Sequence, residues 1–254
     1  MAKITEIHPD EIETKGYNEI VKVTQYPWSN IYDDGNAPAN NSTYGATFAR
    51  NISGFSWGTF FESLDGFYSS GASITHDRVE LETPAIPGNS AEILKDPQWC
   101  PEKVSFDYDM VMETAVYFAD STNQEAWIIV GDHTDSSIGF KVDDNVLKGF
   151  INAYIWNPLA FPSPAFEWKE TTVTLKTGVA VAWRLTAKFI AGNRIDFEAY
   201  DLNDDNLYTG SINTDLPTGS LHPDNKILNV LITTDEDVAK TMELYYWRFE
   251  QSYD

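Results

Sequence analysis

The chain has 254 residues, with 39 acidic side chains against 17 basic ones, a net charge of −22 and 14% aromatic residues. A chain of this length folds either as two ordinary domains or as one large all-β sandwich. The negative charge opposes contact with a phosphate backbone or an anionic membrane surface, which excludes nucleic-acid binding through basic patches. Its single cysteine, Cys100, excludes an internal disulfide framework.

The first residues carry no targeting signal. Residues 1–16 are charged throughout and have no apolar core, so they do not form a signal peptide. No apolar run approaches the ~20 residues that a membrane helix needs, so no membrane insertion is expected. We therefore expect a protein made in a cytoplasm. Its acidity is explained by a solvated, repulsive surface, with a high-salt habitat as the alternative.

Strand signals dominate the chain. Segments rich in Val, Ile, Thr and aromatic residues alternate with clusters of Gly, Asn and Asp, which is typical of a sandwich or barrel. The predicted strands are 19–24, 44–51, 58–62, 66–68, 72–75, 78–83, 104–112, 115–119, 127–131, 137–142, 146–154, 171–176, 181–190, 194–201, 206–212, 228–233 and 242–250. Short helical turns are predicted at 91–96 and 236–241. No linker divides the chain, so we expect an N-terminal arm over residues 1–41 and a single sandwich domain over 42–254.

Segment 181–201 predicts a hairpin with a three-residue loop at 191–193, where Gly or Asn supplies the left-handed position. The apolar pairs in this register are Phe189 with Ile195, Ala187 with Phe197 and Leu185 with Ala199. A shift by one residue would place Phe189 opposite Asp196, which a half-buried sheet does not accept.

Segment 137–154 predicts a second hairpin, with a two-residue turn at Asp144 and Asn145. Its apolar pairs are Val142 with Leu147, Phe140 with Gly149 and Ile138 with Ile151. On the outer face Lys141 meets Lys148, a repulsion that Asp143 and Asp144 can relieve.

Several stretches occur in the order of one known fold. They are SSGASITHDRVELETPAIPGNSAEIL, VSFDYDMVMETAVYFADS, WIIVGD, GFKVDDNVLKGFI, TTVTLKTG, WRLTAKFIAGNRIDFEAYD, INTDLPTG and ILNVLITTDEDVAKTMELYYWRFEQ. Together they resemble the concanavalin A-like (laminin-G-like) jelly roll, particularly as found in structural proteins of tailed viruses. The aromatic closing strand of that family is matched by Tyr245, Trp247 and Phe249. The resemblance covers residues 66–250 and implies a two-sheet antiparallel β-sandwich.

The carboxylates do not show the pattern of a glycosidase. Retaining glycosidases use two carboxyl groups about 5 Å apart, and laminarinase-type members of this superfamily carry a Glu-x-Asp-x-x-Glu strand pattern that the chain lacks. The nearest carboxylates are Asp107, Asp109 and Glu113, Glu80 and Glu82, and Asp196 and Glu198. The chain also has no Gly-x-Ser-x-Gly and no phosphate-loop motif, and Cys100 is explained as a packing residue. We therefore expect no enzyme activity.

One loop has the composition of a calcium site. Asp201, Asn203 and Asp205 match the first three ligand positions of a calcium loop, but the twelfth position is Ile212 rather than a bidentate Glu. Asp and Asn clusters also cap ordinary turns through their own backbone bonds. The capped turn is the favoured interpretation, and no cofactor is expected. The alternative is a structural calcium, which the resemblance implies because concanavalin A-like domains often carry calcium in such loops.

Two aromatic segments are candidates for a glycan site or a subunit interface. In 153–168 the aromatic residues are interleaved with prolines, which predicts a rigid loop and excludes a central strand. The same residues would serve equally to plug one end of the sandwich. The candidates are Trp156, Phe161, Phe166 and Trp168 in this segment, with Tyr26 and Trp28 in a second loop near the N-terminus.

The resemblance and the lack of catalytic spacing favour a non-enzymatic virion structural protein, such as a capsid decoration, turret or tail-fibre component. Its expected partners are further copies of itself, other virion proteins and a host glycan, with residues 1–41 as the anchor. The alternative is a cellular carbohydrate-binding module or glycoside hydrolase of the same superfamily. That alternative predicts a concave sheet face with exposed Trp or Tyr and, for an enzyme, two carboxylates within about 5–9 Å.

Overall fold

The computed structural model describes residues 47–51, 54–60, 68–74, 78–95, 104–132, 134–157, 159, 165–179, 181–220 and 228–252. These residues form sixteen strands: β1 (Thr47–Asn51), β2 (Gly54–Phe60), β3 (Tyr68–Ser70), β4 (Ala72–Ile74), β5 (Val79–Glu82), β6 (Ser90–Lys95), β7 (Met110–Phe118), β8 (Gln124–Gly131), β9 (Ser137–Asp143), β10 (Val146–Asn157), β11 (Ala165–Thr177), β12 (Ala182–Ile190), β13 (Arg194–Asp201), β14 (Asn206–Ile212), β15 (Leu228–Thr234) and β16 (Thr241–Ser252). Nothing in this part of the chain is a helix of the length and apolarity needed to cross a membrane.

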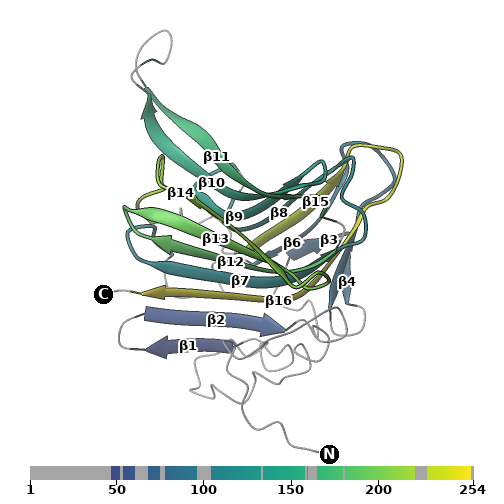
Figure 1. Cartoon of the computed structure of the whole chain (residues 1–254), viewed down its shortest axis with the longest axis horizontal. Helices are drawn as coiled ribbons and strands as arrows, with labels where there is room; N and C mark the ends of the chain where they lie inside the picture. The colour runs from purple at the N-terminus through teal and green to yellow at the C-terminus, as the bar shows by residue number, and fades with distance from the viewer. Residues whose placement is uncertain are drawn as a thin grey trace, which may run out of the picture.

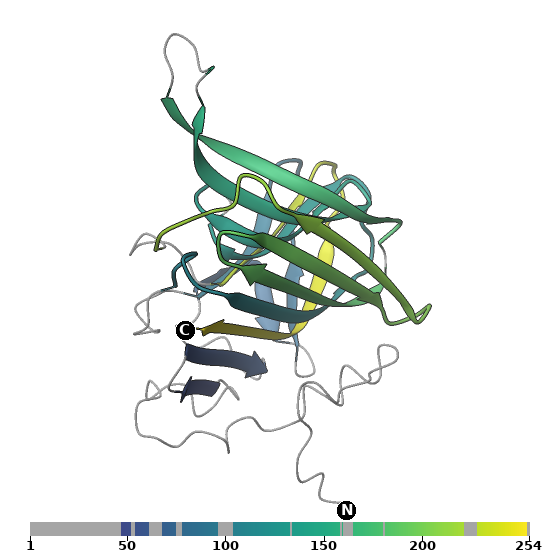
Figure 2. The same cartoon turned by 60° about the vertical axis from the view of Figure 1, so that its left-hand side comes forward.

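The strands form two antiparallel sheets that pack face to face (Figures 1 and 2). Sheet A has the order β1-β2-β16-β7-β12-β13-β14, with β5 beside β16 and β4 beside β5. Sheet B has the order β11-β10-β9-β8-β15-β6-β3. Strands distant in the sequence are neighbours in both sheets, as a jelly roll requires. The predicted two-sheet β-sandwich is therefore confirmed.

The core lies between the sheets and follows from the two-residue period of a strand. In β7 every second residue is buried, from Met110 to Phe118. Aromatic side chains interlock across the layers: Phe140 of sheet B meets Phe197 of sheet A edge to face, with 5.6 Å between ring centroids. Residues of the closing pattern, Tyr245, Trp247 and Phe249, are all fully buried.

Both predicted hairpins have the predicted register. In β12–β13, Ala187 lies opposite Phe197, and in β9–β10, Phe140 lies opposite Gly149. The turn residues Asp144 and Asn145 have φ angles of 42° and 68°. Two consecutive left-handed residues form the tight turn whose twist matches antiparallel strands.

Several predicted elements are corrected by the structure. Residues 91–95 belong to strand β6 rather than to a helical turn, because Ala91 and Ile93 alternate into the core. The helical turn expected near 236–241 is absent, since residues 235–240 form bends and irregular chain before β16. Segments 104–112 and 115–119 contribute one strand, β7. The predicted arm, residues 1–41, lies outside the described residues.

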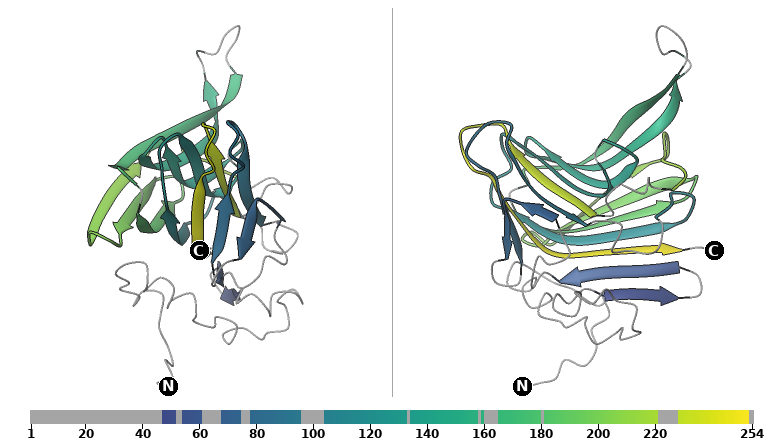
Figure 3. Two further views of the ribbon diagram at one scale, coloured as in Figure 1. Left: turned by 90° about the vertical axis from the view of Figure 1, so that its right-hand side faces the viewer. Right: turned by 180° about the vertical axis from the view of Figure 1, so that it is seen from behind.

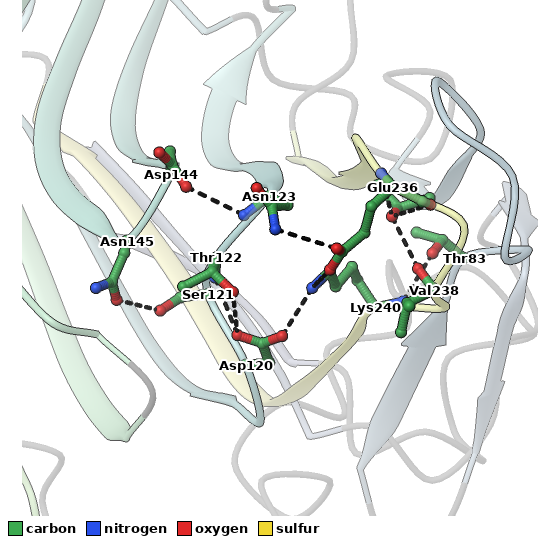
Figure 4. A network of polar contacts seen from close by, with 11 residues as sticks. Thr83, Asp120, Ser121, Thr122, Asn123, Asp144, Asn145, Glu236, Val238 and Lys240 are labelled. Atoms are coloured by element: carbon green, nitrogen blue, oxygen red, sulfur yellow. Dashed lines mark hydrogen bonds and ion pairs between the residues drawn. The ribbon is translucent and has the colours of Figure 1, made fainter.

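A buried lysine joins loops at one end of the sandwich (Figure 4). The Lys240 side chain is 1% exposed, and its Nζ lies 2.7 Å from Asp120 and 2.5 Å from Glu236. Glu236 also accepts a 3.1 Å hydrogen bond from Asn123, whose backbone N–H donates to Asp144. These contacts tie the β7–β8, β9–β10 and β15–β16 connections together.

This network predicts a loss of stability in acid. The hydrogen bond from Lys240 is the main cause that lowers the pKa of Asp120 to about 2. A carboxyl group with a lowered pKa stabilises the fold at pH values above its unfolded-state pKa, near 3.8. This stabilisation is lost as the pH falls toward 2. Because this carboxylate is half-exposed, we expect its contribution to be on the order of 1 kcal/mol after solvent screening. Urea unfolding between pH about 5 and about 2 should show a shallower decline for Asp120→Asn than for the unchanged protein; equal declines would contradict this assignment.

Candidate functional site

Sheet B is curved along its strands, and its concave face is turned away from sheet A (Figures 1 and 3). The hairpin of β10 and β11 rises beyond the sandwich at one end of this face. Side chains that alternate with the core residues of these strands therefore point to the concave side. This face is the candidate site.

Lys141 of β9 joins three strands on the concave face. Its Nζ lies 2.7 Å from Glu125 of β8 and 3.3 Å from Glu170 of β11. The same ammonium lies 5.1 Å from the centroid of the Trp127 ring. Burial lowers the pKa of Lys141, but the hydrogen bonds and charges of the two glutamates outweigh burial and raise the pKa above its ordinary value. The lysine is therefore charged and fully engaged with protein carboxylates.

The predicted pair of Lys141 and Lys148 is present, since the two residues are directly opposite each other in β9 and β10. Lys148 binds Asp143 at 2.5 Å, as expected. Lys141 instead uses Glu125 and Glu170, which the sequence did not single out. Each ammonium on this face thus has its own carboxylate partner, and the repulsion is relieved.

Apolar and amide side chains lie beside the charged residues. Gly139 of β9 lies opposite Phe150 of β10 on one side and opposite Ile129 of β8 on the other. The Phe150 and Ile129 side chains point away from the core between the sheets, yet both are buried. Asn152 follows Phe150 on the same face and donates a 3.0 Å hydrogen bond to the backbone carbonyl of Asp135. These three side chains are almost fully buried and support the face from beneath, whereas the carboxylates of Glu125 and Glu170 are partly exposed and accessible to a ligand.

Three exposed aromatic rings continue the concave face onto the projecting hairpin. Tyr154 of β10 stacks on Phe166 of β11 with 5.4 Å between ring centroids, and it lies tilted against Trp168 with 4.9 Å between centroids. Their exposed fractions are 54%, 55% and 45%, respectively, which is unusual for large apolar side chains. We call these three residues the hairpin rings. Trp168 and Glu170 alternate along β11, so the rings share the face that carries Lys141.

The structure brings Phe166 and Trp168 together, with Tyr154 as a third member that sequence reasoning missed. It corrects the predicted rigid loop, because both residues belong to strand β11 at the edge of sheet B. Trp156 is opposite Phe166 in the ladder. The remaining aromatic candidates, Phe161, Tyr26 and Trp28, lie outside the described residues. The two-residue alternation of 166, 168 and 170 is the signal that could have revealed the strand.

The predicted calcium loop is organised by a salt bridge. Asp201 is fully buried; one carboxylate oxygen binds Lys176 at 2.8 Å, and the other accepts backbone N–H bonds from Asn203 and Asp204. Asp205 supplies a left-handed turn position with φ of 58°. No group of three or more His, Cys, Asp or Glu suited to a metal ion occurs within the described ranges. The contacts of Asp201, Asn203 and Asp205 are thus those of a capped turn.

The carboxylates considered for glycoside hydrolysis lie away from the concave face, on or beside strands of sheet A, and most are engaged with other protein groups. Two of them accept backbone hydrogen bonds, Asp107 from the Gly219 N–H and Asp109 from the Ala191 N–H. Three form salt bridges, namely Glu113 with Arg248, Asp196 with Arg194 and Glu198 with Lys188.

No family model and no curated protein matches the sequence. Among solved structures, a prokaryotic β-1,3-1,4-glucanase (lichenase) from a mouse hindgut metagenome matches at a TM-score of 0.52 and 11% identity, over 76% of this chain and 98% of that one. Arcelin-5, a lectin-like defense protein from Phaseolus vulgaris, matches at a TM-score of 0.51 and 8% identity, over 80% of this chain and 100% of that one. Lectin II from Ulex europaeus matches at a TM-score of 0.48 and 10% identity, over 76% of this chain and 97% of that one. The similarities to the glucanase and to arcelin-5 show the concanavalin A-like fold that the sequence resemblance predicted.

Proposed function

We propose that this protein binds carbohydrate on the concave face of sheet B without cleaving it. The observation that carries the proposal is the exposed set of hairpin rings, which lies on the same face of sheet B as Trp127 and the carboxylates of Glu125 and Glu170. Sugar rings stack on aromatic faces, and their hydroxyl groups bond to carboxylate and amide side chains. The concave face offers both kinds of contact side by side, on a fold that lectins and a glucanase share.

Binding is favoured over hydrolysis by the contacts of the two glutamates. Glu125 and Glu170 both bind Lys141, so their nearest oxygens are separated by no more than the sum of those two distances. Such a spacing would suit a glycosidase, but a glycosidase needs one carboxyl group as an acid and the other as a nucleophile or base. Here one lysine ammonium stands between them and pairs with both. A glycan hydroxyl can still bond to their exposed oxygens.

The proposal predicts a specific loss of binding. The unchanged protein should bind a subset of glycans on a broad array, and Trp127→Ala should weaken binding by about tenfold, the equivalent of one lost ring contact. Tyr200→Ala is the matched control, because Tyr200 is an aromatic residue on the outer face of sheet A, where it packs on Arg184. Equal thermal unfolding temperatures would show that the variants are folded. A folded, unchanged protein that binds no glycan on the array would overturn the proposal.

For the setting of this activity we propose display on a virion, in a homo-oligomer with other virion proteins. The support is the sequence resemblance to structural proteins of tailed viruses, together with a hairpin that projects beyond the sandwich and would present its rings outward. Mass spectrometry of purified particles and the native mass in solution test the setting separately from glycan binding. Absence from particles and a strict monomer would contradict the virion role alone.

A further inference from the structure

We infer that the ligand is an uncharged glycan chain, longer than a disaccharide, which lies across the concave face from Trp127 to the hairpin rings. This inference rests on the proposed function and adds the charge and the size of the glycan. Two independent sets of observations carry it, namely the pairing of the charged groups and the extent of the aromatic surface.

Charge pairing selects against acidic sugars. The cationic side chains on the concave face, within the described part of sheet B, are Lys141 and Lys148, and each is already bound to carboxylates at 3.3 Å or less. The acidic side chains on the same face are Glu92, Glu125, Asp143 and Glu170. A sialic or uronic acid would have to displace one of these glutamates or aspartates from its lysine, against a net protein charge of −22. An uncharged sugar meets no such cost.

The aromatic surface is longer than a small sugar needs. Glu170, Trp168 and Phe166 point to one side of β11. Positions 166 and 170 are four residue steps apart, which corresponds to about 13 Å along the strand. Glu170 in turn contacts Lys141, which lies against Trp127 in β8. A ligand that touches both Trp127 and Phe166 therefore crosses β8, β9 and β10 as well as the outer part of β11. Only a chain of several sugar units spans this distance.

Calorimetric titration tests both parts with neutral gluco-, manno- and galacto-oligosaccharides, from disaccharide to hexasaccharide, beside oligogalacturonates of the same lengths. We expect a hexasaccharide of at least one neutral series to bind about tenfold or more tightly than its disaccharide. The oligogalacturonates should not bind. Trp168→Ala should weaken hexasaccharide binding more than disaccharide binding and so reduce the gain from chain length, whereas Trp127→Ala should weaken both about equally and Tyr200→Ala neither.

The outcomes separate this inference from the proposed function. Affinity that is independent of length, or equal effects of Trp168→Ala on short and long chains, would overturn the extended ligand while leaving glycan binding intact. Tighter binding of oligogalacturonates than of the neutral series would overturn the charge assignment. If the folded protein bound no member of any series and no glycan on the array, the proposed function itself would fail.

Discussion

Replacing Asp120 by asparagine and Glu236 by glutamine in the same chain should lower the free energy of unfolding by about 3 kcal/mol. Both substitutions keep the shape of the side chains, but they leave the Lys240 ammonium without an opposite charge at a position that is 1% exposed. In the native protein, burial lowers the pKa of Lys240, and the two carboxylates more than compensate and raise it. Removing them leaves burial unopposed, so the charged lysine becomes a source of instability.

Urea unfolding followed by tryptophan fluorescence measures this effect, and Lys240→Met in the same background is its control. Methionine has a similar length and no charge, so the triple variant should recover most of the lost free energy. The deficit of the double variant should also shrink at alkaline pH, where its lysine loses the proton. A deficit that Lys240→Met does not reduce would show that the loops, rather than the buried charge, determine the stability of this end of the sandwich.

The parts of the fold that the sequence predicted well are those in which both partners lie close in the chain. The β9–β10 and β12–β13 registers follow from a short turn and from the requirement that apolar residues share one face. The partners of Lys141 could not be predicted in this way. Glu125 and Glu170 come from strands on either side, and only the order of strands in sheet B brings them to one ammonium.

The hairpin rings show a second limit. The prolines between residues 157 and 165 favour a loop over 153–168, whereas residues 153–157 belong to β10 and residues 165–168 belong to β11. Trp168 and Phe166 instead continue the alternation of β11, in the part of the β10–β11 hairpin that rises beyond the sandwich. Composition alone does not separate such a ring from a core ring like Trp183, which is fully buried.

Phe197→Ala should destabilise the protein by about 4 kcal/mol, near the upper end for loss of a buried ring. Residue 149 of the facing sheet is glycine, and a Cβ built there would lie 2.4 Å from the Phe197 ring. The ring therefore fills the space that the glycine leaves, and no side chain at 149 can move into the cavity. For the same reason Gly149→Val alone should cost about 3 kcal/mol through overpacking.

Combined in one chain, the two substitutions should be much less harmful than their sum, because valine at position 149 occupies part of the space that the ring vacates. We expect a coupling of about 2 kcal/mol in a double-mutant cycle measured by urea unfolding. Phe249→Ala in β16 is the control, since its cost should simply add to that of Gly149→Val. Simple addition in both cycles would mean that the sheets shift apart to accept the valine. A large coupling confined to Phe197 would show instead that complementary volumes at this contact hold the two sheets at their observed spacing.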